Sequence, residues 1–176
     1  DEAAFPAYSH RNPVINWLFW QRLRTAINYI EANAPYEKVL DFGCGSGVML
    51  PFLSQHSQQV TAIDIDLLPL EKIKKHIPLA SNVEVLDANR VSVSQLPQKT
   101  FDLINALDVL EHVDDLPRTL SELLSLLKPG GQLVITSPYT WLEEFTPPEN
   151  WLGGFEIDGR RVTTREGLED ALGADF

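Results

Sequence analysis

The stretch Val-Leu-Asp-Phe-Gly-Cys-Gly-Ser-Gly at residues 39–47 decides the fold of this 176-residue chain. An apolar run reaches Asp41 and passes directly into three glycines at alternate positions, Gly43, Gly45 and Gly47. Such a run is typical of a buried parallel strand, and the last glycine can begin a helix. Glycines let the backbone turn sharply and approach a ligand closely, and Asp41 places a carboxylate at the carboxyl end of the strand. The stretch therefore predicts a ligand-binding turn of an open α/β sheet.

The residues after the glycines exclude two common phosphate-binding turns. A P-loop needs Gly-Lys-Ser/Thr, but Gly47 is followed by Val48. A dinucleotide-binding turn needs Gly-x-Gly-x-x-Gly, and Val48 also stands where its third glycine would be. A second apolar run, residues 60–63, ends in Asp64, whose carboxylate suits the two hydroxyls of a ribose. Asp41 beside an amino-acid group and Asp64 on a ribose together indicate S-adenosylmethionine as the ligand.

Five stretches of the sequence resemble, in order, the core of class I S-adenosylmethionine-dependent methyltransferases. They are VLDFGCGSG (39–47), VTAIDID (60–66), VEVLDAN (83–89), FDLINALDVLEHV (101–113) and LKPGGQLVITSP (127–138). The resemblance implies a doubly wound, mostly parallel, Rossmann-like sheet and S-adenosylmethionine as cofactor. The cofactor-binding residues that we expect are Asp41, Gly43, Cys44, Gly45, Ser46, Gly47, Asp64, Ile65, Asp87, Ala88, Ala106 and Leu107.

Composition agrees with a soluble enzyme domain. Hydrophobic residues make up 44% of the chain and charged residues 22%, and no apolar stretch is long enough to cross a bilayer. The net charge of −11 argues against a nucleic-acid partner. The single cysteine, Cys44, excludes an internal disulfide framework and is expected to be a small loop residue rather than a nucleophile. We expect a cytoplasmic location and no membrane partner; the oligomeric state is open.

Alternating apolar patterns predict alternating helices and strands, and hence a parallel sheet. Asn12-Pro13 is expected to open a helix that runs to about Asn33. Asp66 is expected to cap a helix that carries Leu67, Leu70, Ile73 and Ile77. Asp115 is expected to cap another, with Leu116, Leu120, Leu123, Leu124 and Leu127 on one side. The predicted strands are 38–42, 60–64, 83–86, 101–105 and 132–136, with a further helix near 47–55.

The chain is expected to form one methyltransferase domain over residues 1–176. Thr163 and Glu166 form a capping box that predicts a helix ending near Gly173. The family normally adds a final antiparallel strand pair, which is missing before Phe176, so we expect the natural protein to continue. The expected parts are an N-terminal helical segment or lid (1–36), a cofactor-binding core (37–138), an aromatic substrate loop (139–160) and an incomplete C-terminal part (161–176).

The run Asp108-Val-Leu-Glu111-His112 is the first candidate for acceptor chemistry. On a helical turn these three polar side chains would share one face. The run is similar to the Glu-x-x-Glu-His of ubiquinone-pathway O-methyltransferases and small-RNA 2′-O-methyltransferases, where it holds a divalent ion, with Asp108 in place of the first Glu. Three readings stay open: a metal site at Asp108, Glu111 and His112, a catalytic His112 assisted by Glu111, and a structural role.

The second candidate is the aromatic segment SPYTWLEEFTPPENWLGGF at residues 137–155. Aromatic faces attract cations, so Tyr139, Trp141 and Trp151 are candidate substrate-binding residues, with an aromatic plug over the sheet edge as the alternative. Residues 137–176 resemble the methyltransferase domain of ovothiol synthases and the 4-mercaptohistidine N-methyltransferases. That resemblance implies methylation of an imidazole nitrogen of a thiohistidine. Tyr8 and His10 are candidate lid residues over the substrate.

Three functions therefore remain open. The favoured one is N-methylation of a thiohistidine-like small molecule, as part of ovothiol biosynthesis. The second is metal-assisted O-methylation of a small molecule, with Asp108, Glu111 and His112 at the site. The third is a non-catalytic module that binds S-adenosylmethionine.

Overall fold

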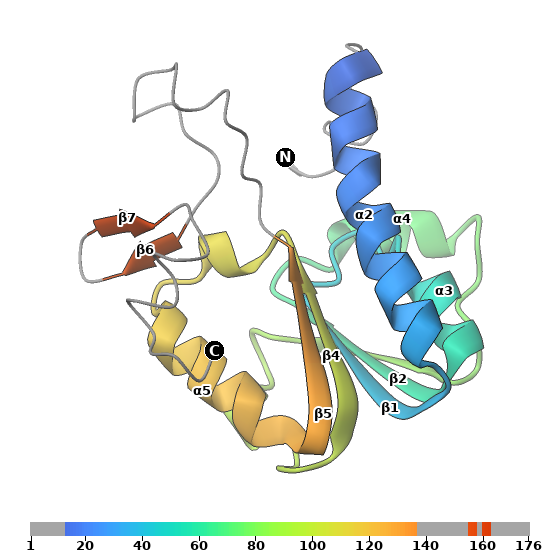
Figure 1. Cartoon of the computed structure of the whole chain (residues 1–176). Coiled ribbons are helices and arrows are strands. Elements are labelled where there is room, and N and C mark those ends of the chain that lie inside the picture. Colours follow the sequence, from blue (N-terminus) through green and yellow to red (C-terminus); the bar gives the residue numbers. More distant parts are fainter. Residues whose placement is uncertain (1–12, 137–154, 158–159, 163–176) are drawn as a thin grey trace.

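The computed structural model describes residues 13–136, 155–157 and 160–162 (Figure 1). Within them, no helix is both long enough and apolar enough to cross a membrane. The predictions for the helix at 163–173 and for Tyr8, His10, Tyr139, Trp141 and Trp151 fall outside these residues.

A five-stranded, all-parallel sheet forms the centre of the molecule (Figure 1). Its strands lie in the order β3-β2-β1-β4-β5, and every neighbouring pair is parallel. The chain builds outward from β1 to β3 and then returns to the other side of β1 for β4 and β5. This confirms the predicted doubly wound fold and puts the switch point between β1 and β4, where such sheets bind ligands. The strands are β1 (Tyr36–Phe42), β2 (Ser57–Asp64), β3 (Val83–Asp87), β4 (Phe101–Leu107) and β5 (Leu127–Thr136).

Helices cover both faces of the sheet. Figure 1 shows α2, α3 and α4 on one side and α5 on the other. The helix predicted to open at Asn12-Pro13 and to end near Asn33 is confirmed as α2. The helices are α2 (Pro13–Asn33), α3 (Leu50–His56), α4 (Leu68–Lys74) and α5 (Leu116–Leu126), with 3-10 turns η1 (Val93–Gln95) and η2 (Leu110–His112).

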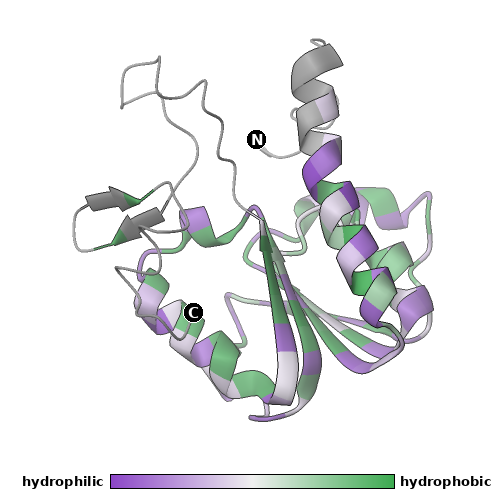
Figure 2. Cartoon of the chain, in the orientation of Figure 1, coloured by the Kyte–Doolittle hydropathy of each residue, from purple (hydrophilic) through white to green (hydrophobic). Residues whose placement is uncertain are grey.

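Two apolar cores lie on the two faces of the sheet, because successive strand side chains point to opposite sides. Val39 packs in the core under α2, α3 and α4, and its neighbour Leu40 packs in the core under α5. Figure 2 shows hydrophobic stretches along the central strands and a mixture of hydrophilic and hydrophobic residues along the helices. The sheet is therefore buried on both faces, as expected from its near-continuous apolar strands.

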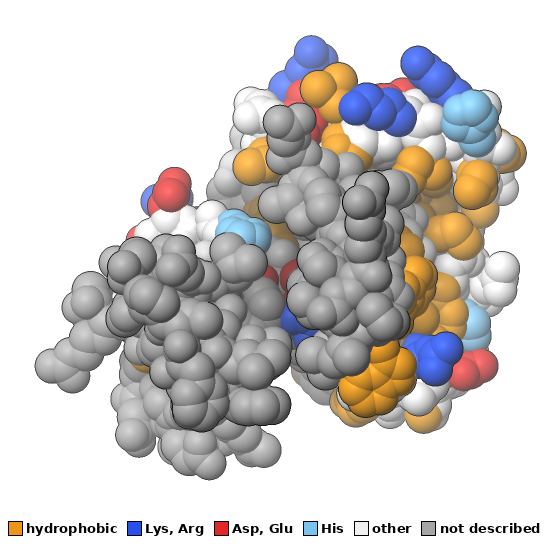
Figure 3. All heavy atoms as spheres, turned by 90° about the horizontal axis from the view of Figure 1, so that it is seen from above, with side chains coloured by type: hydrophobic (Ala, Val, Ile, Leu, Met, Phe, Trp, Pro, Cys, Tyr) orange, Lys and Arg blue, Asp and Glu red, His pale blue; other side chains and the backbone are white. Residues whose placement is uncertain are grey.

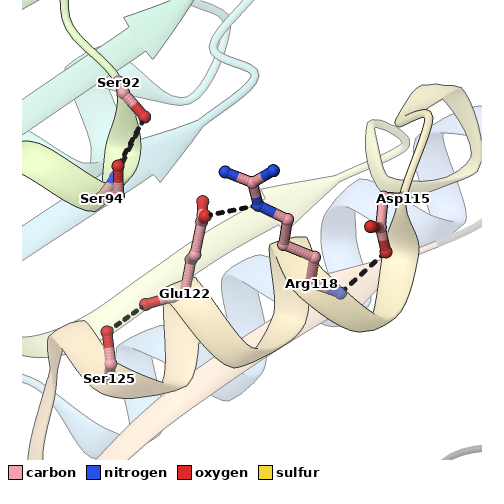
Figure 4. A network of polar contacts seen from close by, with 6 residues as sticks. All are labelled: Ser92, Ser94, Asp115, Arg118, Glu122 and Ser125. Carbon is pink, nitrogen blue, oxygen red and sulfur yellow. Dashed lines mark hydrogen bonds and ion pairs between the residues drawn. The ribbon is translucent and has the colours of Figure 1, made fainter.

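Helix α5 begins at the predicted cap but buries a different set of leucines. Asp115 Oδ1 accepts a hydrogen bond from the Arg118 backbone N–H at 3.0 Å (Figure 4). Leu126 is 1% exposed whereas Leu124 is 47% exposed. The prediction that Leu124 and Leu127 continue the helix face was wrong, because the helix ends at Leu126 and Leu127 already begins β5. The buried helical positions are Leu116, Leu120, Leu123 and Leu126.

Two further elements differ from the predictions. Asp66 accepts a hydrogen bond from the Leu68 backbone N–H at 3.0 Å, but α4 ends at Lys74, so Ile77 lies beyond the helix and is exposed. Antiparallel strands β6 (Phe155–Ile157) and β7 (Arg160–Val162) form a small separate sheet that was not predicted. Each has three residues, which is too short for a period-two pattern to stand out. The buried Ile157 packs in the core under α5.

The contrast between two adjacent leucines of α5 is testable. Leu123→Ala should lower the free energy of unfolding by about 2–5 kcal/mol, because it opens a cavity in the core under α5. Leu124→Ala, on the exposed side, should change it by about 0.5 kcal/mol or less. Urea denaturation of both variants measures the difference, and equal losses would contradict the assignment of the buried face.

Candidate functional site

Polar side chains gather at the carboxyl ends of the parallel strands. Asp41, Asp64 and Asp87 stand at or next to the ends of β1, β2 and β3. This edge lies at the top of Figure 1, and the view from above in Figure 3 shows acidic and basic side chains close together near the middle of that face. Charged groups thus lie where an open α/β sheet binds its ligand.

Asp41 and Asn105 form a buried pair at the switch point. The two residues are partners in the register of β1 and β4. Asn105 Nδ2 donates a hydrogen bond to Asp41 Oδ1 at 2.7 Å, and Asp41 is only 3% exposed. Among the described residues, Asn105 Oδ1 is buried and has no hydrogen-bond partner. A buried acceptor without a donor is costly, so this oxygen is suited to receive a donor from a ligand.

Burial makes the Asp41 carboxylate a stronger base than usual. Removal from water raises the pKa of Asp41 from 3.8 to about 6, and the negative charge of Asp64 adds to the rise. The hydrogen bond from Asn105 opposes it. A bound ammonium group would favour the ionised form, so the site is built to gain from a cationic ligand.

The glycine loop is fixed to the end of β2 by backbone hydrogen bonds. The N–H groups of Gly43 and Cys44 donate to the Ile63 carbonyl at 2.9 and 3.2 Å. Asp64 Oδ2 accepts from the Gly45 N–H at 2.7 Å, and Asp64 Oδ1 accepts from the Asp66 N–H at 2.9 Å. Asp64 therefore holds the glycine loop with one oxygen and the turn after β2 with the other, while keeping lone pairs for a ligand.

Two glycines of the loop serve different purposes. At Gly43, with φ +73°, an added Cβ would lie 2.3 Å from Val109 Cγ2, so this glycine lets the loop pack against the segment after β4. At Gly45, with φ +49°, an added Cβ would meet no described atom within 4 Å. The open space at Gly45 is where a ligand can approach the backbone.

Cys44 is a core residue and not a candidate nucleophile. It is buried, and burial raises the pKa of its thiol, with the charges of Asp41 and Asp64 adding to the rise. A thiol of this kind is a poor nucleophile at neutral pH. Its expected role as a small loop residue fits this environment.

The end of β3 lies beside the end of β2. Asp87 is the register partner of Asp64, and the Ala88 N–H donates to the Asp64 carbonyl at 2.9 Å. Asn89 Nδ2 donates to Asp87 Oδ1 at 2.9 Å and to the Ile65 carbonyl at 2.7 Å. Hydrogen bonds from Asn89 lower the pKa of Asp87. Ile65 itself is 75% exposed, so this corner presents an apolar side chain next to polar groups.

Asp108 is held in a special conformation directly after β4. Its φ is +50°, a left-handed value that is uncommon outside glycine. The Asp108 N–H donates to the Thr136 carbonyl at 2.9 Å, and Thr136 Oγ1 donates to Asp108 Oδ1 at 3.0 Å. Arg22 Nη2 of α2 lies 3.3 Å from Asp108 Oδ2. Three elements, α2, β4 and β5, thus meet at this carboxylate.

Glu111 is a partly buried residue whose carboxylate accepts no hydrogen bond from the residues that the structure describes. Both of its carboxylate oxygens are buried, and neither has a hydrogen-bond partner among the described residues. Burial raises the pKa of Glu111 to about 7; the charge of Asp108 adds to the rise, and its own backbone N–H and Arg22 oppose it. His112, next along the turn, is exposed. Glu111 can therefore exchange a proton near neutral pH, as a general base must.

The run from Asp108 to His112 does not fit a divalent ion. Its residues were expected to share a helical face, but η2 begins only at Leu110 and Asp108 lies before it with a left-handed backbone. Asp108 already binds Arg22 and Thr136. Across the described part of the chain, no group of three or more His, Cys, Asp or Glu side chains is arranged to hold a metal ion.

Sequence reasoning missed three residues of this site. Asn105 is the polar residue within the buried run 103–106 of β4, and its register with Asp41 would have revealed it. Thr136 is visible only once β5 is placed beside β4. Arg22 lies on a helix far from the motifs, and no local pattern indicates it. Of the predicted residues at the end of β4, Ala106 is fully buried and Leu107 is partly buried.

Comparison with known families identifies the family and the fold. The model of the family described as "Methyltransferase domain" matches residues 15–174. The chain belongs to this methyltransferase family. The chain is similar to curated ubiquinone biosynthesis O-methyltransferases. The one from Saccharophagus degradans is 32% identical, over 62% of this chain and 48% of that protein. The mitochondrial ubiquinone biosynthesis O-methyltransferase of Schizosaccharomyces pombe is 35% identical, over 57% of this chain and 38% of that protein. The chain thus spans about half the length, or less, of these curated relatives.

Solved structures share the methyltransferase fold. The N-methyltransferase NodS of Bradyrhizobium japonicum, in complex with S-adenosyl-L-homocysteine, has a TM-score of 0.63 at 20% identity, over 98% of this chain and 78% of that one. A SAM-dependent methyltransferase of Aquifex aeolicus has a TM-score of 0.51 at 30% identity, over 62% of each chain. The [4+2]-cyclase SpnF has a TM-score of 0.62 at 23% identity, over 86% of this chain and 54% of that one. The resemblance to ovothiol synthases has no counterpart in these matches.

The burial of Asp41 predicts a pH-dependent stability. Its pKa is about 6 in the folded protein against 3.8 normally, so the cost of ionising it is absent at low pH and grows as the pH rises from about 4 to about 6. Asp41→Asn should therefore stabilise the ligand-free protein by about 1–3 kcal/mol at neutral pH and hardly at all near pH 4. Denaturation of both proteins across this range measures the difference. The exposed Asp114→Asn is the control, and a gain independent of pH would contradict the assignment.

Proposed function

We propose that this chain binds S-adenosylmethionine and that the full-length protein transfers its methyl group to a small molecule. Family membership, the parallel sheet and the polar groups at its carboxyl edge support this proposal. The site also has the right charge, because S-adenosylmethionine carries an ammonium and a sulfonium group, and Asp41 and Asp64 are acidic.

The cofactor would lie along the ends of β1, β2 and β4. In this arrangement its amino-acid part faces Asp41 and the unpaired Asn105 Oδ1. Its ribose faces Asp64, and its adenine lies near the exposed Ile65 and the β3 end at Asp87 and Ala88. Gly45 provides the close approach to the backbone. Ser46, Ala106 and Leu107 keep the cofactor-binding role expected from the sequence.

The unpartnered Glu111 carboxylate is the observation that carries the proposed chemistry. An acceptor hydroxyl needs a base, and Glu111 has a pKa of about 7 with both oxygens free of described partners. Glu111 would take the hydroxyl proton as the oxygen lone pair forms the new bond to the methyl carbon. The carbon–sulfur bond breaks at the same time, and its electrons return to sulfur to give neutral S-adenosylhomocysteine. The remainder of the acceleration comes from holding the reacting atoms in line.

We place a hydroxyl acceptor first, because the geometry provides a base and the similar curated proteins are named O-methyltransferases. A thiohistidine imidazole stays the second candidate, supported by the sequence resemblance of residues 137–176 to ovothiol synthases. A module without methyl transfer is the third, because one fold hosts many functions and the similarly folded SpnF is a cyclase. The roles of Tyr8, His10, Tyr139, Trp141 and Trp151 and the division into segments stay predictions.

Mass spectrometry of methyl transfer by the full-length protein tests the proposal. S-adenosylmethionine is offered with catechol-type phenols on the one hand and with 5-thiohistidine on the other. Methylated phenol supports the first candidate, and methylated thiohistidine replaces it with the second. Binding of S-adenosylhomocysteine without any product would leave the non-catalytic module.

Glu111→Gln is expected to lower kcat by about 100-fold or more, because a general base is lost. Since Glu111 must be ionised, wild-type kcat should rise with pH through about 7, and the rise should be absent in the variant. Initial rates from pH 5 to pH 9 measure both effects, with S-adenosylhomocysteine affinity as the check on binding. His112→Gln is the comparison, and a larger loss there would transfer the base role to His112.

Gly45→Ala is expected to weaken S-adenosylhomocysteine binding by about tenfold or more, because a Cβ would occupy the space left for the ligand. The left-handed backbone should also cost about 1–2 kcal/mol of stability. Gly130→Ala is the matched control: its φ is +80° and its Cβ meets no described atom within 4 Å, but it lies at the start of β5. Calorimetric titration should separate the two, and equal affinities would contradict the cofactor placement.

A further inference from the structure

We call the part of the site around Asp108 and Glu111 the acceptor side, because the methyl acceptor would bind there. It holds two carboxylates whose charges influence each other. Asp108 precedes the turn that carries Glu111, and its negative charge disfavours ionisation of Glu111. Both side chains are largely withdrawn from water: the Asp108 side chain is 19% exposed, and both oxygens of Glu111 are buried. A carboxylate as withdrawn from water as that of Asp108 gains from a nearby cation.

Arg22 provides that positive charge from within the chain. Its Nη2 lies 3.3 Å from Asp108 Oδ2, and its side chain is 22% exposed. Thr136 Oγ1 donates to the other oxygen of Asp108 at 3.0 Å, so the carboxylate cannot turn away from the guanidinium without losing this bond. The charge of Arg22 also opposes the rise in the pKa of Glu111.

The Asp108 backbone shows that this arrangement is strongly constrained. An aspartate at φ +50° is uncommon, and the bonds of its N–H and its side chain to Thr136 keep it there. In this conformation Asp108 faces α2 instead of sharing one helical face with Glu111 and His112. The donor set that a divalent ion would need is therefore not assembled among the described residues, and a fixed cation stands beside it.

We propose that the Arg22 guanidinium is the resident cation of the acceptor side and a positioning residue for the Asp108 carboxylate, in the place that a divalent ion would otherwise fill. The inference rests on the proposed function. It makes α2 part of the site, because this helix brings a positive charge to the Asp108 carboxylate, which precedes the turn that carries Glu111. No metal ion is required for methyl transfer to a hydroxyl acceptor.

Arg22→Met in the full-length protein is the first part of the test. We expect kcat/KM for the acceptor to fall about 10- to 100-fold, with unchanged S-adenosylhomocysteine affinity. Guanidinium at millimolar concentration should restore part of the activity, which it cannot do if Arg22 only stabilises the fold. Arg22→Lys should retain more activity than Arg22→Met. The matched control is Arg24→Met, an exposed arginine on the same helix, which should behave as the wild type.

Metal dependence is the second part of the test. Wild-type turnover should be the same with EDTA as with Mg²⁺, and the electron paramagnetic resonance spectrum of Mn²⁺ should stay that of the free ion when the protein saturated with S-adenosylhomocysteine is added. The Mn²⁺ measurement needs no acceptor, so it tests the inference independently of whether methyl transfer is found. Loss of turnover in EDTA with recovery in Mg²⁺, stoichiometric Mn²⁺ binding, or full activity of Arg22→Met would each overturn the proposal.

Discussion

The hydrogen bonds of the Asp64 carboxylate hold the glycine loop in the shape on which the site depends. One oxygen accepts from Gly45 and the other from Asp66, so a single side chain fixes the loop after β1 and the turn after β2. This is possible because β1 and β2 are parallel neighbours whose registers end together at Phe42 and Ile63. Asp64 is therefore both a structural clamp and a candidate ligand of the cofactor. Removing it would change the loop and the binding surface at once.

The negative charges at the carboxyl edge of the sheet repel one another in the ligand-free protein. For the same reason this edge suits a cationic cofactor. Asp64 raises the pKa of Asp41, and both acids raise that of Cys44. In the ligand-free protein this repulsion is offset by Asn105 and by backbone N–H groups. A ligand with an ammonium and a sulfonium group would relieve it. Because methyl transfer removes the sulfonium charge, the product would interact less favourably with such an edge than the substrate cofactor does.

The sequence predicted the elements of the core well because the signals there are local. Apolar runs ending in an acid marked β1 and β2, and a proline after an N-capping residue marked the start of α2. Where the outcome depends on packing, the prediction was wrong. Leu124 has the apolarity of its neighbours, but only the crossing of α5 over the sheet decides that it faces solvent. The short β6 and β7 are held by burial of Ile157 rather than by any pattern of their own.

The same distinction separates the two halves of the candidate site. The cofactor edge is built from residues next to strand ends, so their positions follow from the order of the motifs. The acceptor side is built from long-range contacts: Asp108 to Thr136 between strands, and Asp108 to Arg22 across to α2. The run from Asp108 to His112 looks like a metal-binding motif in sequence. The left-handed backbone of Asp108 instead directs its carboxylate toward Arg22. In the proposed site the charge on the acceptor side comes from a helix that precedes the motifs, so similarity across the motif region alone does not carry the chemistry from one family member to another.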